Sequence, residues 1–131
     1  MKNKKVLIVS ARYYEDFSNS LELVASSHLH DKKIKYKIIK VPGVFEIPVA
    51  ISKNIKKYDG FIALGCVIKG ETPHFDFISQ ATTNAIMQLS INHKKPIGNG
   101  IITSLNGEQA LIRSKTKGGE AAKAVISILS Q

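Results

Sequence analysis

The sequence predicts an α/β fold in which a four-stranded parallel sheet carries helices on both faces. Short apolar runs alternate along the whole chain with longer segments in which apolar residues recur every three or four positions. The apolar runs are continuous, which indicates strands that are buried on both faces. A regular alternation of such strands with helices is typical of a parallel sheet.

Four segments are predicted to form the strands. The second contains several lysines, which favours an edge position. The Asn99-Gly100 pair in the fourth segment would by itself predict a hairpin turn, but the alternation of strands and helices on both sides of it argues against one. The predicted strands are residues 5–11, 35–41, 61–64 and 96–103.

The segments between the strands have the apolar spacing of helices. Ser18 is expected to cap the first helix. Thr72 and Pro73 have the residue types of a helix start, since Thr caps well and Pro suits the first helical position. The predicted helices begin at residues 18, 48, 73, 106 and 119, and the last of them ends at residue 129.

The size and charge of the chain limit what it does. Its 131 residues suit a single domain, residues 1–131, and its formal net charge is +9. Such a charge is compatible with nucleic-acid binding. The lysines are scattered, however, and Arg12 and Arg113 are the only arginines, although arginine is the residue that most often contacts bases and phosphates. This composition favours a small anionic substrate over a nucleic acid.

Nothing in the sequence indicates a membrane protein or a secreted one. No apolar run is long enough to span a bilayer, and the N-terminus lacks the features of a signal peptide. The single Cys66 cannot form an internal disulfide, which fits a reducing cytosol. We expect it to be a small buried residue at a strand end rather than a nucleophile, and we predict a cytoplasmic protein.

Residues 67–72 are predicted to form a loop between a buried strand and the next helix. Open parallel sheets bind ligands at such places, and the N–H groups and dipole at a helix start favour an anion. His74, in the first helical turn, is expected to be neutral there and able to accept a proton. A helix cap followed by a surface histidine is the plainer interpretation, and both stay open at this point.

Another segment is expected on the same side of the sheet. Phe45 and Glu46 follow the Pro42-Gly43 turn, just beyond the second strand. Their position beyond a strand end places them with the predicted ligand. The alternative for Glu46 is a first-turn carboxylate that stabilises the following helix through its dipole.

Several blocks of the sequence together resemble the lumazine synthase family. They follow one another in order over nearly the whole chain, and the segment from Gly70 to Asp76 is highly specific. The blocks are PGVFEIP at 42–48, GCVIKGETPHFD at 65–76, PIGNGIIT at 96–103, EQA at 108–110 with Arg113, and KGGEAA at 117–122.

The resemblance implies a flavodoxin-like three-layer αβα sandwich and a transferase of riboflavin biosynthesis. Its reaction would condense 5-amino-6-(D-ribitylamino)uracil with 3,4-dihydroxy-2-butanone 4-phosphate to 6,7-dimethyl-8-ribityllumazine, releasing phosphate and water. The resemblance further implies small-molecule substrates, no metal and no cofactor. It also implies a homopentamer with sites shared between neighbouring subunits, and association with riboflavin synthase.

The resemblance also assigns roles to residues of this chain. His74 corresponds to the residue that transfers protons. The phosphate would be held by Arg113, whose guanidinium matches it with parallel hydrogen bonds, and by Glu71 and Thr72 at the helix start, largely through backbone N–H groups. The pyrimidine and the ribityl chain would be held by Tyr13, Val44, Phe45, Glu46, Val67, Ile68, Lys69 and Asn99, with Lys117 and Glu120 as supporting residues.

The chain departs from the usual pattern of the family. Tyr13-Tyr14 stands where the family often has Phe or Trp followed by Asn, and Asn99 stands where many members have Phe. The loop between Arg113 and Lys117 is a few residues shorter than usual. The chain begins almost directly at the first strand, and many shell-forming members carry an extra strand there, so a bare pentamer is favoured.

The rival interpretation is a flavodoxin-like module without catalysis that binds a phosphorylated ligand or a flavin. Composition and topology alone permit it. The presence of His74 beside the anion site, together with Arg113 from a distant segment, favours the enzyme, because a binding module needs the anion site but not the proton transfer.

Overall fold

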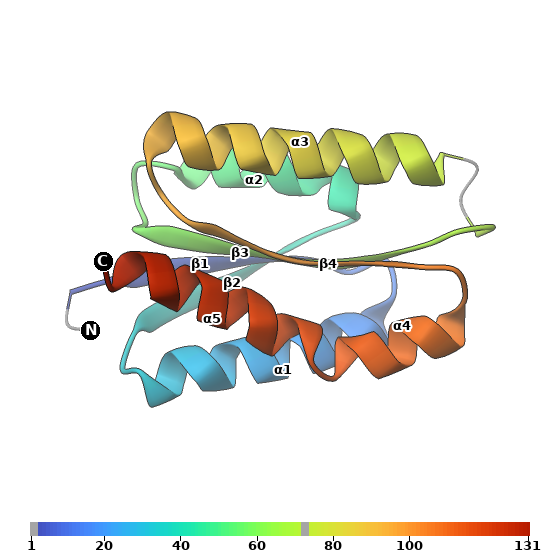
Figure 1. Ribbon diagram of the computed structural model, residues 1–131, viewed down its shortest axis with the longest axis horizontal. Coiled ribbons are helices and arrows are strands. Elements are labelled where there is room, and N and C mark those ends of the chain that lie inside the picture. Colours follow the sequence, from blue (N-terminus) through green and yellow to red (C-terminus); the bar gives the residue numbers. More distant parts are fainter. Residues whose placement is uncertain (1–2, 72–73) are drawn as a thin grey trace.

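The computed structural model describes residues 3–71 and 74–131, and these form three layers (Figure 1). The strands are β1 (Lys5–Ala11), β2 (Lys35–Val41), β3 (Gly60–Ile68) and β4 (Ile97–Ser104). The helices are α1 (Glu15–Asp31), the short 3-10 helix η1 (Val44–Glu46), α2 (Ile47–Asn54), α3 (Phe75–His93), α4 (Gly107–Ser114) and α5 (Lys117–Leu129). Figure 1 shows α2 and α3 on one face of the sheet and α1, α4 and α5 on the other. The predicted three-layer sandwich is confirmed.

The sheet is parallel throughout, with the strand order β2-β1-β3-β4. β2 lies at an edge, as its lysines predicted, and the side chains of Lys35 and Lys37 are exposed. Asn99 and Gly100 lie inside β4 and pair with Ala63 and Leu64 of β3. The prediction that these two residues form no hairpin turn is therefore confirmed.

Side chains of successive strand residues point to opposite faces, so the sheet separates two cores. Ile8 and Ile62 belong to the core beneath α1 and α5, and Leu7 and Phe61 belong to the core beneath α2 and α3. Ile8, Ile62 and Phe61 are fully buried. Burial on both faces explains why the strand sequences are continuously apolar.

β3 is longer than predicted. Its last residues, Val67 and Ile68, pair with Thr103 and Ser104 of β4, which extends the ladder to the end of both strands. The prediction that the loop begins at residue 67 was therefore wrong. The loop starts at Lys69, and Val67 and Ile68 belong to the sheet, where β4 is their partner strand.

Two helix starts also differ from prediction. α1 begins at Glu15, and Ser18 lies in its first turn, where the Ser18 hydroxyl donates to the Ala11 carbonyl oxygen at 2.5 Å instead of capping the helix. α5 begins at Lys117, which places Gly118 inside the helix and against the backbone of Leu21. The expected start of α3 at residues 72–73 lies outside the described residues.

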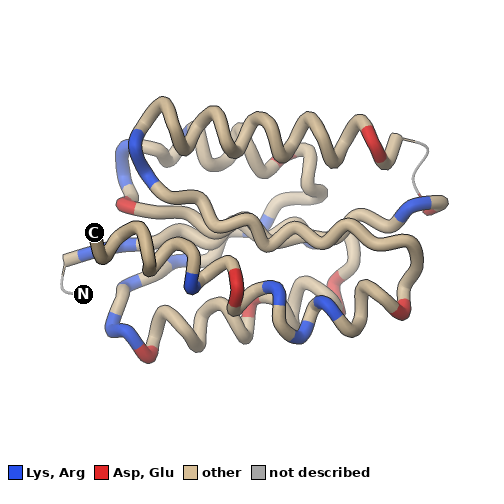
Figure 2. The backbone as a smooth tube through the Cα atoms, viewed as in Figure 1, with Lys and Arg blue, Asp and Glu red and all other residues tan. Residues whose placement is uncertain are grey.

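The charged residues are spread over the molecule. Figure 2 shows Lys and Arg on both helical layers and at both ends of the sheet rather than on one face. This distribution agrees with the scattered lysines of the sequence. Within the described residues, no helix combines the length and the apolar character needed to cross a membrane.

Candidate active site

A cavity of about 300 Å³ opens beyond the carboxyl ends of β1 and β3. This first cavity lies where open parallel sheets bind ligands. Four parts of the chain contribute to it: the loop after β1, the segment around η1, the end of β3 with the loop that follows, and the first turn of α3. Its lining residues are Tyr13, Tyr14, Gly43, Val44, Phe45, Cys66, Val67, Ile68, Glu71 and Ile78.

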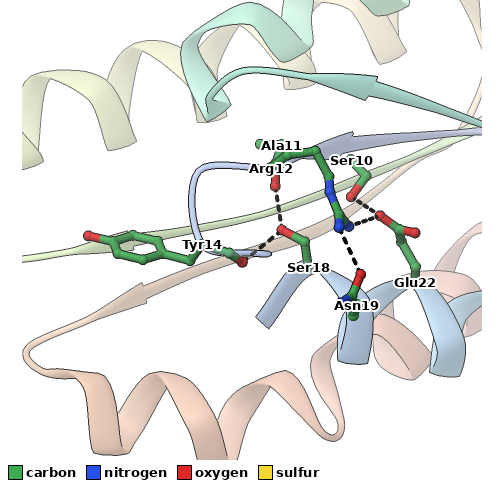
Figure 3. Close-up of polar contacts among 7 residues, drawn as sticks. All are labelled: Ser10, Ala11, Arg12, Tyr14, Ser18, Asn19 and Glu22. Carbon is green, nitrogen blue, oxygen red and sulfur yellow. Dashed lines mark hydrogen bonds and ion pairs between the residues drawn. The ribbon is translucent and has the colours of Figure 1, made fainter. Parts of the chain in front are cut away.

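The loop after β1 is held by a network of polar contacts (Figure 3). Arg12 Nη1 lies 2.6 Å from Glu22 Oε2, and Arg12 Nη2 donates to Asn19 Oδ1 at 2.8 Å. The Ser10 hydroxyl also donates to Glu22 Oε2, at 2.5 Å. Since Glu22 and Asn19 belong to α1, this network fastens Arg12, and with it the start of the loop, to that helix.

Ser18 holds the same loop at its other end. Its hydroxyl contacts the carbonyl oxygens of both Ala11 and Tyr14, at 2.5 and 3.1 Å. The loop therefore presents Tyr13 from a fixed backbone. The Tyr13 side chain is 73% exposed and packs edge-on against the Tyr14 ring, with 4.9 Å between the ring centroids, so a ring face of Tyr13 is open to stack on a planar ligand.

Sequence reasoning missed Tyr14, Arg12 and Glu22. The sequence pattern gives Arg12 no role beyond its charge, and Tyr14 stands out only as a departure from the family pattern. The spacing of Arg12 and Glu22 gives no signal, because their contact depends on how α1 packs beside β1. A polar side chain such as Ser10 inside an apolar strand was the one available hint, since a buried hydroxyl needs a partner.

The segment around η1 places Phe45 and Glu46 differently. Phe45 is 63% exposed and lines the first cavity. Glu46 does not line it, and Glu46 Oε1 accepts from the Gly43 N–H at 2.9 Å. This bond fixes the turn before α2, a contact that neither interpretation of Glu46 from the sequence predicted, and leaves the second carboxylate oxygen for other partners.

The loop between β3 and α3 carries the expected proton-transfer residue. Gly70 has a φ of 89°, a left-handed conformation that favours glycine. The Glu71 N–H donates to the Ile68 carbonyl oxygen at 3.2 Å, and the Lys69 N–H donates to the Ser104 carbonyl oxygen at 2.8 Å. His74 is exposed at the N-cap position of α3. Thr72 lies outside the described residues.

A second cavity, of about 230 Å³, lies between the end of β4 and the segment from α4 to α5, and Arg113 lines it. Arg113 Nη1 donates to the Thr103 carbonyl oxygen at 2.6 Å, which directs the guanidinium along the end of β4. The lining residues of this second cavity are Ile101, Ile102, Thr103, Arg113, Thr116, Lys117 and Glu120.

Within a single chain, the expected site residues that line a cavity are split between the first cavity and the second. Tyr13, Val44, Phe45, Val67, Ile68 and Glu71 line the first cavity, and Arg113, Lys117 and Glu120 line the second. Asn99 is exposed on β4, where its Oδ1 accepts from the Ile101 N–H at 3.0 Å, and it belongs to neither described lining. The chain does not bring Arg113 into the cavity that holds Tyr13.

Two side chains that line the first cavity, Tyr14 and Cys66, have raised pKa values. Burial, followed by the nearby Glu71 charge, raises the pKa of the Tyr14 phenol to about 12. Burial and the same carboxylate raise the pKa of the Cys66 thiol to about 11. Cys66 is buried at 8% exposure, so it is a protonated small residue at the end of a strand, as the sequence predicted, rather than a ready nucleophile.

Comparison with known proteins agrees with this architecture. The family model for 6,7-dimethyl-8-ribityllumazine synthase matches residues 3–131. The 6,7-dimethyl-8-ribityllumazine synthase of Agrobacterium fabrum is 42% identical over 140 residues, covering 98% of this chain and 95% of the relative. The enzyme of the same name from Bartonella tribocorum is 44% identical over 136 residues, covering 98% of this chain and 90% of the relative. The chain therefore belongs to the 6,7-dimethyl-8-ribityllumazine synthase family.

Proposed function

We propose that the chain carries out the reaction of its family with the pyrimidine substrate in the first cavity. As a lumazine synthase, the chain is a transferase that condenses 5-amino-6-(D-ribitylamino)uracil with 3,4-dihydroxy-2-butanone 4-phosphate and releases phosphate and water. The observation that supports the placement is the position of Tyr13 and Phe45 at a cavity beyond the carboxyl ends of the strands. The cavity volume of about 300 Å³ suits a small heterocycle.

The pyrimidine stacks on the open face of Tyr13 and lies against Val67 and Ile68. These two residues lie at the end of β3 and pair with Thr103 and Ser104 of β4, so their backbone is fixed from that side. Lys69 follows them at the rim. The ribityl chain runs past Val44 and Phe45 toward Glu46, whose second carboxylate oxygen accepts from its hydroxyl groups.

Arg113 holds the phosphate of the butanone substrate, together with Thr72 and the backbone at Glu71. The 5-amino group of the pyrimidine attacks the ketone, a first water leaves as the imine forms, and phosphate is eliminated. The ribitylamino nitrogen then attacks the carbonyl group that this elimination creates, and the ring closes with loss of a second water. His74 accepts and returns protons during these steps. Much of the rate comes from holding two reactants side by side, which removes the entropic cost of their encounter.

The separation of Arg113 from Tyr13 within one chain leads us to propose a site shared between subunits of a homopentamer. Arg113, Asn99, Lys117 and Glu120 of one subunit then complete the first cavity of its neighbour. The exposed apolar residues of α3 provide surface for such contacts, because Phe77, Met87 and Ile91 are 80%, 58% and 62% exposed in the single chain. A cytoplasmic location and association with riboflavin synthase complete the proposal.

Mixing of two impaired variants tests the shared site. His74→Ala and Arg113→Ala are each purified, unfolded together, refolded and assayed for fluorescent lumazine above the uncatalysed background. Mixed oligomers contain some sites in which an intact His74 meets an intact Arg113, so at a low concentration of the butanone phosphate their activity should exceed that of either variant alone. Each variant refolded alone is the control, and native mass spectrometry gives the subunit number. Absence of recovery in verified mixed oligomers would mean that both residues act from the same chain.

A further inference from the structure

Arg12 joins the loop after β1 to two other elements, and the proposed reaction gives it no part. Its backbone N–H donates to the Val41 carbonyl oxygen at 2.9 Å. Its guanidinium reaches α1, where Nη1 lies 2.6 Å from Glu22 Oε2 and Nη2 donates to Asn19 Oδ1 at 2.8 Å. The residue therefore ties the end of β2 and the first half of α1 to the loop after β1.

The guanidinium holds the loop in one orientation. Asn19 and Glu22 are three residues apart and lie on one face of α1, so the planar fork of the guanidinium meets both from the same side. A lysine offers a single charged group and does not reproduce this pair of contacts. Figure 3 shows the Arg12 side chain directed toward α1 and the Tyr14 ring directed away from it.

Tyr13 lies between two residues that are both held. Arg12 precedes it, and Tyr14 follows it. The Tyr14 carbonyl oxygen accepts from the Ser18 N–H at 3.0 Å, and the Tyr14 hydroxyl donates to Glu71 Oε1 at 3.2 Å. The Tyr13 ring is 73% exposed and has little packing of its own beyond the edge contact with Tyr14. Its position therefore depends on how firmly the backbone on either side is held.

Arg12 also relates the two exposed aromatic rings of the first cavity. Val41 directly precedes the turn that leads to Phe45, and Phe45 lines the cavity. The hydrogen bond from Arg12 to Val41 joins the backbone that carries Tyr13 to the backbone that carries Phe45. The side chain of Arg12 thus anchors a backbone position from which both rings are placed.

The network carries charge in a place that water reaches poorly. The Arg12 and Glu22 side chains are 17% and 15% exposed, and Ser10, whose hydroxyl donates to Glu22, is fully buried. Withdrawing such charges from water costs free energy, and apolar groups of similar volume often give equal or greater stability. What the charged network adds is direction, because its hydrogen bonds weaken steeply when the donor angle changes.

We propose that Arg12 is a positioning residue for the pyrimidine substrate, and that it acts by holding the loop from which Tyr13 stacks on the heterocycle. The inference rests on the proposed function, in which Tyr13 contacts the pyrimidine and not the butanone phosphate. Without the network the loop has to be ordered when the pyrimidine binds, and the entropic cost of that ordering reduces the affinity. Binding of the phosphate substrate does not require this loop and should not change.

Calorimetric titration of the full chain with 5-amino-6-(D-ribitylamino)uracil tests the proposal. Arg12→Met is expected to weaken binding about tenfold. Arg12→Lys keeps the charge and one contact with Glu22, and it should weaken binding only about threefold. In steady-state assays the KM for the butanone phosphate should stay within about twofold of wild type for both variants, and so should the kcat when both substrates are saturating.

Two further variants separate positioning from stability. Arg12→Met with Glu22→Gln removes the unpaired carboxylate, so it should be more stable than Arg12→Met but should bind the pyrimidine just as weakly. Leu29→Ala leaves a cavity beneath the last turn of α1, at the other end of the helix from the loop. It should lower the stability of the chain without changing its affinity for the pyrimidine.

Lys123→Met, at an exposed position of α5, also removes one positive charge and should bind as wild type does. Wild-type affinity in Arg12→Met would overturn the inference. A double variant that regains affinity together with stability would also overturn it, and so would a Leu29→Ala variant that binds as weakly as Arg12→Met, because a general loss of stability would then explain the effect. A wild-type chain that neither binds the pyrimidine nor forms lumazine would instead overturn the proposed function.

Discussion

Arg12 and Glu22 form an ion pair, 2.6 Å from Nη1 to Oε2, beside the loop that presents Tyr13 to the first cavity (Figure 3). Their side chains are only 17% and 15% exposed. A pair this sheltered from water is screened little, so removing one partner leaves a charge that water solvates poorly.

Arg12→Met is expected to lower the free energy of unfolding by about 2 kcal/mol, between the values typical of exposed and of buried pairs. Urea unfolding followed by circular dichroism measures this. The double variant Arg12→Met with Glu22→Gln should regain part of the loss, because the unpaired carboxylate is gone. If the double variant loses the sum of the two single losses, the two side chains are not coupled.

Gly98→Ala should destabilise the chain strongly. A Cβ at Gly98 would collide with the carbonyl group of Ala121 and lie 2.9 Å from Val125 Cγ2, because α5 packs directly on β4. Backbone cannot move aside as a flexible side chain can, so we expect a loss of about 3 kcal/mol, the upper end for overpacking. Gly107→Ala is the control. It meets nothing within 4 Å in the first turn of α4, and it should leave stability unchanged or raise it slightly.

Alkaline pH should weaken the fold partly through Cys66. Burial raises the pKa of its thiol from 9.0 to about 11 in the folded chain. Between these pH values the thiol is deprotonated in the unfolded chain and protonated in the folded chain. The contribution of Cys66 to the free energy of unfolding is therefore fully present below pH 9 and is lost as the pH rises toward 11. Cys66→Ala should show a shallower fall over this range in urea unfolding. A fall equally steep in both proteins would remove the thiol as a cause.

Replacement of His74 should slow turnover rather than weaken binding. His74→Ala removes the proposed acid–base group, and we expect the kcat to fall on the order of 10²-fold, the low end for such groups. Lumazine fluorescence under saturating substrates measures the kcat. His93→Ala removes an exposed histidine at the other end of α3 and should leave the kcat unchanged. A kcat within twofold of wild type for His74→Ala would exclude its role in proton transfer.

Loss of Arg113 should act on the phosphate substrate. Arg113→Ala is expected to raise the KM for 3,4-dihydroxy-2-butanone 4-phosphate by about tenfold or more, since a guanidinium–phosphate contact is charge-assisted. The KM for the pyrimidine should change little. Lys115→Ala removes the same charge from an exposed neighbouring position and serves as the control. Normal affinity of Arg113→Ala for the phosphate substrate would refute the assignment.

The sequence by itself determined the fold class, the edge position of β2 and the identity of the family. Apolar periodicity is a local property, and the continuous runs of β1 and β3 are a direct consequence of burial on both faces. The motif from Gly70 to Asp76 was specific enough to indicate the family, and the full-length match confirmed it.

Only the tertiary structure decided how the candidate site is assembled. The contact between Tyr14 and Glu71 joins residues 57 positions apart, and it depends on how two loops meet at the end of the sheet. The extension of β3 through Ile68 depends on its pairing with β4. That partner strand is distant in the sequence, so the residues around Ile68 do not by themselves reveal it. The separation of Arg113 from Tyr13 follows in the same way from the sheet, which places the first cavity and the second cavity apart and so leaves the site of a single chain divided.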